Sequence, residues 1–339
     1  MRAVVAHEYG TPEVLRVTET AVPQPGPRQI LVRIRAAGLN PMDLRNLDGS
    51  VREMVPLSFP YTPGADFAGT VIDIGSDVTS FAPGDEIFGA GLPRGAAALA
   101  DLLSTPASLT TGAMAEYAVF EADTPALAVR PPGLAADRAA TLPIAGLTAL
   151  ALLRAGEFRT GHTALVVGAA GGVGCAVVPL LAAAGVRVVA TAIAADQDLL
   201  RGLGAAEVID YRAVGTAAET RRLFPDGVDA VLNLALTGPA LREIGAVVAT
   251  GGRLLDIVYG GPDPADSVRS DVRAHTVYGT AGPGDLDLLA EQAVAGILPD
   301  TVARRYPLAD APRAYADLAG AHIRGKLVVT VPGDDAPGR

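Results

Sequence analysis

Short apolar runs rich in β-branched residues alternate with turn residues through the first third of the chain. Two such runs are Ile-Leu-Val-Arg-Ile at residues 30–34 and Thr-Val-Ile-Asp-Ile at 70–74, and turns such as Pro-Gly-Pro at 25–27 separate the runs. Runs of this length between turn signals are typical of β-strands. The pattern therefore predicts a compact β-rich domain, to which we assign residues 1–126.

Apolar strands alternate with helical segments from about Asp137 onward. Such alternation is typical of a parallel sheet with crossover helices. The spacing predicts an α/β fold with a doubly wound, six-stranded Rossmann sheet, in a domain that we assign to residues 127–283. We expect residues 284–339, with a helix and a final strand, to return to the first domain. The candidate strands of the Rossmann sheet are 164–167, 187–191, 207–209, 230–233, 253–257 and 275–278.

Residues 91–112 are rich in Ala, Leu, Ser and Thr and have no clear periodicity. A segment of this kind between strands is typical of a surface loop or a short helix. We expect an insertion here that forms a lid over a pocket.

A glycine-rich turn follows the first strand of the predicted Rossmann sheet. It lies between the strand 164–167 and the helical run 175–184, and Ala169 stands at the first glycine of the common G-x-G-x-x-G pattern. A dinucleotide pyrophosphate needs backbone N–H groups at a helix N-terminus and glycines that let it approach. A glycine turn without a ligand is the alternative, but the flanking strand and helix favour cofactor binding. The predicted loop residues are Gly168, Ala170, Gly171, Gly172, Val173 and Gly174.

The end of the second strand of this sheet distinguishes NAD from NADP. An acidic side chain there would hydrogen-bond the adenosine ribose 2′-OH of NAD. The segment 190–195 reads Ala-Thr-Ala-Ile-Ala-Ala and contains no acid, although Asp196 follows closely. We therefore predict NADPH as the cofactor, with Thr191, Ala192 and Tyr211 near its 2′-phosphate. The alternative is that Thr191 and Tyr211 only end a strand and pack.

The composition excludes several other classes of protein. Half of the residues are hydrophobic, and the formal charge of -10 repels nucleic acid phosphates. The single cysteine, Cys175, cannot form an internal disulfide or a multi-cysteine zinc site and fits a reducing compartment. The most apolar stretch, 165–189, is broken by glycines and Pro179, which argues against a membrane span. We expect a soluble cytoplasmic protein that binds neither nucleic acid nor membrane.

Motifs spread over nearly the whole chain occur in a collinear order. They include the Leu-Asn-Pro-x-Asp turn at 39–43, Pro-Gly-Ala-Asp-Phe-Ala-Gly-Thr-Val at 63–71, Gly-Leu-Thr-Ala at 146–149 and Arg-Gly-Lys-Leu-Val at 324–328. Together they resemble the zinc-independent quinone oxidoreductases of the medium-chain dehydrogenase/reductase superfamily. The resemblance implies that the first domain is a GroES-like catalytic domain.

The resemblance also implies roles for individual residues. In the family, the Asn of the Leu-Asn-Pro-x-Asp turn lies beside the nicotinamide and the Thr of Gly-Leu-Thr-Ala contacts its ribose, which points to Asn40 and Thr148. Asn40 has an alternative as a turn residue that satisfies its own backbone. Lys326 either reaches the cofactor or is a solvated charge at a strand start. The strand ends expected to flank the nicotinamide half are Asn233, Leu234, Ala235, Ile257, Val258 and Tyr259.

Neither zinc site of the zinc-containing relatives can be built from this sequence. Those relatives carry a catalytic cysteine where this chain has Gly38-Leu39-Asn40, and a four-cysteine lobe for which this chain has no residues. Hydride transfer to a quinone or an enone needs no Lewis acid, whereas alcohol oxidation needs its alkoxide stabilised. We therefore predict no metal and an NADPH-dependent reductase of a quinone or another conjugated carbonyl.

Three residues are candidates for direct participation in the reaction: Asn40, Arg45 and Tyr61. Arg45 stands where related quinone reductases often have a tyrosine, and it either stabilises an enolate, binds an anionic substrate or is a surface cation. Tyr61, Tyr259 or water are possible proton donors.

Two other functions remain open at this point. A dedicated enoyl or enone (C=C) reductase of a biosynthetic pathway would share every motif above. A non-catalytic NADPH-binding protein would bind the cofactor without consuming it. By analogy with the family we expect a homodimer.

Overall fold

A computed structural model of the 339-residue chain describes residues 1–91, 111–259, 261 and 263–332. The insertion predicted for residues 91–112 lies outside the described residues except at its two ends. The chain divides into two compact units. Unit 1 comprises Met1–Ile144, Ala281–Val294 and Asp300–Arg339, and unit 2 comprises Ala145–Thr280 and Ala295–Pro299.

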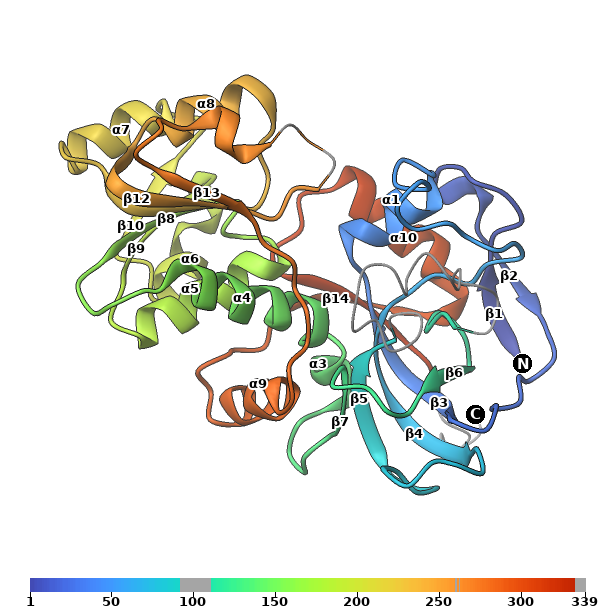
Figure 1. Ribbon diagram of the computed structural model, residues 1–339. Helices are drawn as coiled ribbons and strands as arrows, with labels where there is room; N and C mark the ends of the chain where they lie inside the picture. Colours follow the sequence, from blue (N-terminus) through green and yellow to red (C-terminus); the bar gives the residue numbers. More distant parts are fainter. Residues whose placement is uncertain (92–110, 260, 262, 333–339) are drawn as a thin grey trace. The chain divides into compact units, whose positions relative to one another are not determined.

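Strands from both ends of the chain form one seven-stranded sheet in unit 1 (Figure 1). Strand β3 (Gln29–Gly38) pairs antiparallel with β4 (Asp66–Ile74), β6 (Tyr117–Glu121) and β15 (Lys326–Thr330). The remaining strands are β5 (Glu86–Ala90), β7 (Leu127–Val129) and β14 (Val302–Pro307). The pairing of β3 with both β4 and β15 brings distant parts of the sequence to one place.

Smaller elements surround this sheet. Asn40 is the N-cap of the first helix and Pro41 is its first residue, which is a favoured start for a helix. Helix α10 contacts both α1 and β15. These elements of unit 1 are β1 (Arg2–Val5), β2 (Arg16–Glu19), α1 (Pro41–Leu47), α3 (Ala136–Ala139), α9 (Asp285–Val294) and α10 (Ala311–Gly320).

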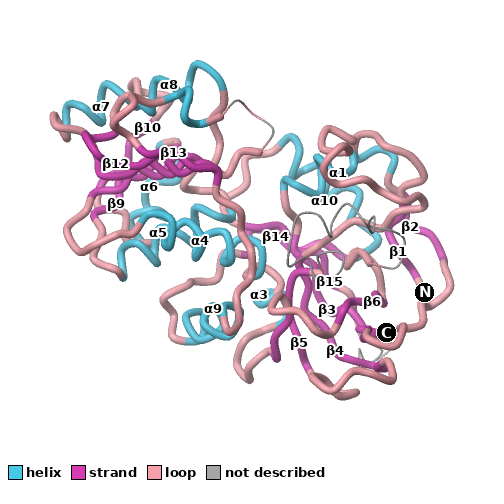
Figure 2. The backbone as a smooth tube through the Cα atoms, in the orientation of Figure 1, coloured by secondary structure: helices cyan, strands magenta, loops and turns pink. Residues whose placement is uncertain are grey.

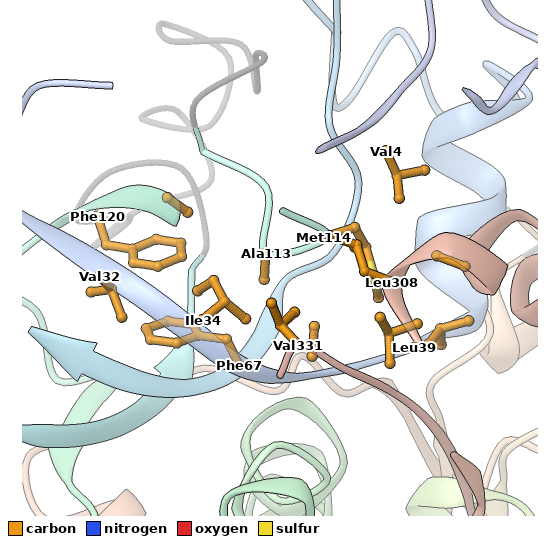
Figure 3. Packing of buried hydrophobic residues seen from close by; sticks show 14 of the residues in the cluster. Val4, Val32, Ile34, Leu39, Phe67, Ala113, Met114, Phe120, Leu308 and Val331 are labelled. Atoms are coloured by element: carbon orange, nitrogen blue, oxygen red, sulfur yellow. The ribbon is translucent and has the colours of Figure 1, made fainter. Parts of the chain in front are cut away.

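The apolar core of unit 1 is built from alternate residues of its strands (Figure 3). Val32 and Ile34 of β3 share a face, because successive side chains of a strand point to opposite faces. Phe67 of β4 stacks on Phe120 of β6, with 4.1 Å between the ring centroids. Full burial of one such side chain contributes about 1.5–3 kcal/mol to stability. This packing fixes the strands that carry the buried polar cluster described below.

Unit 2 contains a six-stranded parallel sheet with the order β10-β9-β8-β11-β12-β13. Strand β8 is the first strand of this sheet in sequence and lies in its interior. The next two strands, β9 and β10, lie on one side of β8, and the following three, β11, β12 and β13, lie on the other side. This is the doubly wound arrangement. The predicted fold is therefore confirmed. The strands are β8 (Thr163–Val167), β9 (Arg187–Ala192), β10 (Glu207–Asp210), β11 (Val228–Asn233), β12 (Val248–Asp256) and β13 (Arg273–Thr276).

Helices cover both faces of this sheet, α7 and α8 on one face and α4, α5 and α6 on the other (Figure 2). Helix α5 is buried along most of its length and continues through Pro179. None of the helices in the described ranges is long and apolar enough to cross a membrane. The helices are α4 (Pro143–Gly156), α5 (Gly172–Ala183), α6 (Gln197–Gly202), α7 (Thr216–Leu223) and α8 (Gly238–Gly245).

The ends of the strands of unit 2 lie within two residues of their predicted positions, except at the start of β12. Strand β12 begins at Val248 rather than at residue 253, because the Thr-Gly-Gly sequence that resembles a turn lies inside an irregular strand whose register shifts. Strand β13 ends at Thr276, two residues before the predicted end. The prediction followed the apolar Val277 and Tyr278, whereas the pairing with β12 uses Arg273 to Thr276.

Candidate functional site

The glycine-rich turn joins the carboxyl end of β8 to the amino end of α5. Gly171 is the N-cap of α5 and has an extended backbone, with φ -77° and ψ 177°. A Cβ atom added there would meet Gly168 O at 3.5 Å, which is ordinary van der Waals contact. The described chain therefore does not crowd Gly171, and the missing Cβ leaves the room that the close approach of a phosphate would require.

Two other glycines of the turn are required by the chain itself. Gly168 has a φ of +82°, in the left-handed region that favours glycine. A Cβ atom at Gly174 would lie 2.2 Å from Ala169 O, so a side chain there would separate α5 from the turn. The other predicted loop residues, Ala170, Gly172 and Val173, lie in the same turn and in the first turn of α5.

The three residues predicted near a 2′-phosphate lie at the carboxyl ends of β9 and β10. The Thr191 hydroxyl accepts a hydrogen bond from Gly168 N at 3.3 Å, which links β9 to the glycine turn. Tyr211 N donates to Ala192 O at 3.2 Å, and the Tyr211 side chain is 48% exposed. Asp196, in contrast, is fully buried. The exposed part of this region therefore presents a phenol and no carboxylate from Asp196.

Asn233 is fully buried and orders the turn after β11. Its Nδ2 donates to Asp256 Oδ1 and to Leu236 O, each at 2.8 Å, and its Oδ1 accepts from Leu236 N at 2.9 Å. Asp256 Oδ1 also accepts from Val258 N at 3.1 Å. These bonds connect the ends of β11 and β12 and set the course of the predicted segments Leu234–Ala235 and Ile257–Val258.

Two further predicted residues of unit 2 are closely packed. A Cβ atom at Gly279 would lie 2.4 Å from Thr148 Oγ1, so Thr148 contacts the backbone after β13. Tyr259 stacks on Tyr278 at 5.0 Å between centroids, and its hydroxyl donates to Val277 O at 3.0 Å. Burial raises the pKa of Tyr259 to about 12. A hydroxyl with its proton engaged and its pKa raised is a poor proton donor.

Unit 1 contains a buried polar cluster around Asn40, which we define as Asn40, Asp43, Asp66, Tyr315 and Lys326. Lys326 Nζ donates to Asn40 Oδ1 at 2.5 Å and to Asp66 Oδ2 at 2.8 Å. Asn40 Nδ2 donates to the same Asp66 Oδ2 at 3.0 Å. All five side chains are nearly inaccessible, and Lys326 is 4% exposed, so it is not the solvated charge of the alternative interpretation.

The register of the sheet explains how this cluster forms. Gly38 of β3 pairs with Asp66 of β4 on one side and with Val328 of β15 on the other. Asn40 and Lys326 each lie two residues beyond that antiparallel pair, at the same end, and Leu39 N still donates to Leu327 O at 3.0 Å. The two side chains therefore meet although 286 positions separate them in sequence.

Asp43 lies on the first turn of α1, in the same cluster. Its Oδ2 accepts from Asn40 N at 2.9 Å and from the Tyr315 hydroxyl at 3.5 Å. Burial raises the pKa of Asp43 to about 7, and the neighbouring Asp66 adds to this rise. Asp43 can therefore hold or release a proton near neutral pH.

The two other candidate catalytic residues lie differently. Tyr61 is 4% exposed, and burial, together with the charge of Asp43, raises its pKa. Arg45 is partly exposed on α1, two residues after Asp43. Side chains two positions apart on a helix do not face each other, so Arg45 points away from the direction of Asp43.

Sequence reasoning missed the parts played by Asp66 and Asp256. Asp66 belongs to one of the collinear motifs, but its pairing with Lys326 is not visible in the sequence. The available signal was an acid within an apolar strand, because a buried carboxylate requires a partner. The same signal marks Asp256 after Leu254 and Leu255.

A polar cavity of about 240 Å³ lies at the opposite, amino-terminal edge of the unit 2 sheet, lined in part by Glu157, Arg253 and Arg273. Glu157 forms ion pairs with both arginines and so offsets their charge. The cavity is therefore not an unopposed anion site. Within the residues that the structure describes, no group of three or more His, Cys, Asp or Glu side chains is arranged to hold a metal ion.

Comparisons of the sequence place it among dehydrogenase-like proteins. Residues 26–130 match the alcohol dehydrogenase GroES-like domain, and residues 203–329 match a zinc-binding dehydrogenase family. The chloroplastic quinone-oxidoreductase QR1 of Triphysaria versicolor is 31% identical, with 97% of this chain and 98% of that protein covered. The quinone oxidoreductase of Sus scrofa is 30% identical, with 96% and 95% covered. The polyketide synthase system protein NorB of Streptomyces orinoci is 34% identical over 93% of this chain, which is 14% of NorB.

Solved structures resemble this chain over nearly its whole length. The quinone oxidoreductase of Coxiella burnetii has a TM-score of 0.87 at 28% identity, with 98% of this chain and 99% of that chain covered. Mycobacterial Rv1454c in complex with NADPH has a TM-score of 0.80 at 27% identity, with 97% and 100% covered. The CurK enoyl reductase has a TM-score of 0.81 at 25% identity, with 98% and 99% covered.

Proposed function

The chain belongs to the quinone oxidoreductase branch of the medium-chain dehydrogenase/reductase superfamily, and from this premise we propose that it is an NADPH-dependent reductase of quinones or other conjugated carbonyls that works without zinc. The observation that carries the proposal is the uncrowded backbone at Gly171, at the amino end of α5 and close to the carboxyl end of β8. The similarity to quinone oxidoreductases supports the binding of a nicotinamide cofactor at this glycine turn. The choice of NADPH, the acceptor and the lack of zinc are our proposals.

Three features support NADPH over NADH. The end of β9 has no acid, Asp196 is buried, and Tyr211, whose backbone N–H donates to Ala192 O, is exposed. A 2′-phosphate bound at this strand end would meet no acid from β9, and the Tyr211 phenol could donate a hydrogen bond to it. The related Rv1454c structure contains NADPH, which agrees with this assignment.

The proposed cofactor-binding residues of unit 2 act mainly through their backbone. NADPH, when bound, supplies the hydride. The N–H groups at the start of α5 would bind its pyrophosphate, while Asn233 holds the turn that carries Leu234 and Ala235. Thr148 and the segment 257–259 are proposed to contact the nicotinamide half. The protein then mainly orients the reactants.

The environment of Asn40 supports a reaction without zinc. Zinc-containing relatives carry a cysteine ligand in this region, whereas here the Asn40 amide oxygen already accepts from the Lys326 ammonium at 2.5 Å. An amide oxygen that already accepts a hydrogen bond from an ammonium group is not free to coordinate a metal ion. We propose that Asn40 lies at the reacting end of the site and that Arg45 and Tyr61 contribute to substrate binding.

An enoyl or enone reductase is the second candidate. It is favoured by the similarity to the CurK enoyl reductase and to a segment of NorB. Reduction of a C=C bond needs a proton after the hydride, and the Asp43 carboxyl, with a pKa of about 7, is a group in unit 1 that can hold one. A non-catalytic NADPH-binding protein is the third candidate.

Consumption of NADPH and NADH tests these candidates. We would follow the loss of absorbance at 340 nm, a general property of reduced nicotinamides, with 1,4-benzoquinone, 9,10-phenanthrenequinone and several enones. Faster turnover of NADPH with a quinone supports the proposal. Turnover with enones alone supports the second candidate, and binding of NADPH without consumption supports the third.

The proposal extends to the assembly and location of the protein. We propose a homodimer in the cytoplasm, with domains at residues 1–126, 127–283 and 284–339. Light scattering of the purified protein tests the dimer.

A further inference from the structure

Both ends of the Asn40 side-chain amide are held by charged groups. The Lys326 ammonium donates to the amide oxygen, and the Asp66 carboxylate accepts from the amide nitrogen. Lys326 and Asp66 also form an ion pair with each other at 2.8 Å, and the second oxygen of Asp66 accepts from Ile144 N at 2.9 Å. The three side chains form a closed triangle with exposures of 4%, 0% and 4% for Asn40, Asp66 and Lys326.

This triangle determines the orientation of the amide. A rotation of the amide by 180° would place its NH₂ group against the ammonium and its oxygen against the carboxylate. Both contacts would be repulsive, in a buried place where charges interact more strongly than in water. The ion pair therefore fixes the side chain with its oxygen toward β15 and its nitrogen toward β4.

Net stability is a poor explanation for such an ion pair. Removing two charges from water offsets most of their attraction, and replacing a buried pair by apolar residues is often neutral or stabilising. The fixed amide, however, retains one Nδ2 hydrogen that has no partner among the residues that the structure describes. An N–H group held in one direction recognises a carbonyl oxygen.

We propose that Lys326 and Asp66 are positioning residues, which hold the Asn40 amide as an oriented hydrogen-bond donor for a carbonyl oxygen. This inference rests on the proposed function. The oxygen belongs either to the nicotinamide carboxamide or to the carbonyl of the substrate, where negative charge develops after hydride transfer. Lys326 and Asp66 act on that oxygen through Asn40.

The test removes the two charges together. Lys326→Met alone leaves Asp66 as an unpaired buried charge, which is strongly destabilising, so the single variant is expected to unfold. The double variant Lys326→Met/Asp66→Asn leaves no unpaired charge, and the new amide oxygen at position 66 can still accept from Ile144 N. The thioether introduced at position 326 cannot donate to Asn40, so the Asn40 amide is released while the cluster stays filled. A matched control is Arg130→Met/Glu86→Gln, which removes another ion pair of unit 1 that does not contact Asn40.

Two measurements distinguish the sources of the oxygen. If it belongs to the substrate, the double variant lowers kcat with 1,4-benzoquinone by about 10²-fold and leaves the Kd for NADPH, measured by fluorescence titration, unchanged. If it belongs to the cofactor, the Kd for NADPH rises instead. In both cases, the same double substitution in an Asn40→Ala background causes no further loss, because the pair acts through Asn40. The control pair changes neither quantity.

Two results would overturn the inference. One is an unchanged kcat and an unchanged Kd in a folded double variant. The other is a loss that is equally large in the Asn40→Ala background, which would mean that the pair acts independently of Asn40.

Failure of the proposed function is a separate result. If the wild-type protein binds NADPH but reduces no acceptor, the proposed reductase is rejected. The positioning role is then tested only by the Kd for NADPH of the wild type and of the double variant. An unchanged Kd in the double variant overturns the role.

Discussion

Asp43 places a carboxyl group in the interior of unit 1, where it has no ion pair among the described residues. The groups that face it are Asp66, Lys326, Tyr61 and Tyr315, of which Lys326 is already paired with Asp66. Burial raises the pKa of Asp43 from 3.8 to about 7. The folded protein therefore holds this proton more tightly than the unfolded chain does.

The substitution Asp43→Asn tests this through stability. Because the pKa is higher in the folded state, the stability that Asp43 contributes is complete below about pH 4 and is lost as pH rises toward 7. The free energy of unfolding of the wild type should fall relative to the variant by at most about 4 kcal/mol over this range. Urea unfolding at several pH values measures the difference, and a constant difference between pH 4 and pH 7 contradicts the raised pKa.

Gly171 and Gly174 should respond differently to alanine. The Cβ of Gly171→Ala would make only ordinary van der Waals contact with the chain, so the free energy of unfolding should change by less than about 1 kcal/mol while the affinity for NADPH falls. The Cβ of Gly174→Ala would lie 2.2 Å from Ala169 O, so this variant should be destabilised even without ligand. Thermal unfolding and NADPH titration of both variants give the comparison. Equal loss of stability in both would reject a ligand-related reason for Gly171.

At the scale of elements, the carboxyl end of β9 is where cofactor choice is proposed to occur. Ile193 directly follows β9 and is partly exposed, whereas Ala192 is buried. An acid at position 193 would therefore face solvent or a ligand without being forced into the core.

The substitution Ile193→Asp should shift the preference from NADPH toward NADH. Repulsion between the new carboxylate and a 2′-phosphate should weaken NADPH binding by about tenfold or more, while NADH binding stays the same or improves. Titration with both cofactors measures the ratio of their Kd values, and Ile193→Asn controls for the change in shape. An unchanged ratio in the aspartate variant would mean that the 2′-phosphate does not bind at this strand end.

The strands themselves were largely predictable, because strand and helix patterns depend on neighbours in sequence. All six strands of the Rossmann sheet were located, with the largest error at the start of β12 and errors of two residues at the start of β11 and at both ends of β13. Those ends depend on pairing: Arg253 pairs with Arg273, and a Gly-Gly sequence continues β12 instead of ending it. Arg253 and Arg273 carry no apolar signal from which this pairing could be inferred.

At the scale of the whole molecule, the proposal of a reaction without zinc predicts the effect of chelators. Dialysis against EDTA should change kcat with a quinone by less than about twofold, because the Asn40 amide oxygen is already engaged by Lys326 and hydride transfer to a quinone needs no Lewis acid. Metal analysis of the dialysed protein provides the control. A loss of activity that zinc restores would refute this part of the proposal.

Local patterns in the sequence were enough to predict the succession of strands and helices, the doubly wound fold and the glycine turn at the start of α5. Each of these depends on local properties: side-chain periodicity, backbone freedom at glycine, and the N–H groups of one helix end. Asn40 and Lys326 were each identified as candidate site residues from a short motif that resembles the motif of the family at the same place in the chain.

The tertiary structure alone decided that Asn40, Asp66 and Lys326 meet. Their contact depends on the register of β3 with both β4 and β15, across 260 positions of sequence between Asp66 and Lys326. Only the packed sheet makes the site dry enough that the ion pair orients the amide and that Asp43 holds a proton near pH 7. Burial and register are properties of the folded chain, and no segment of the sequence contains them.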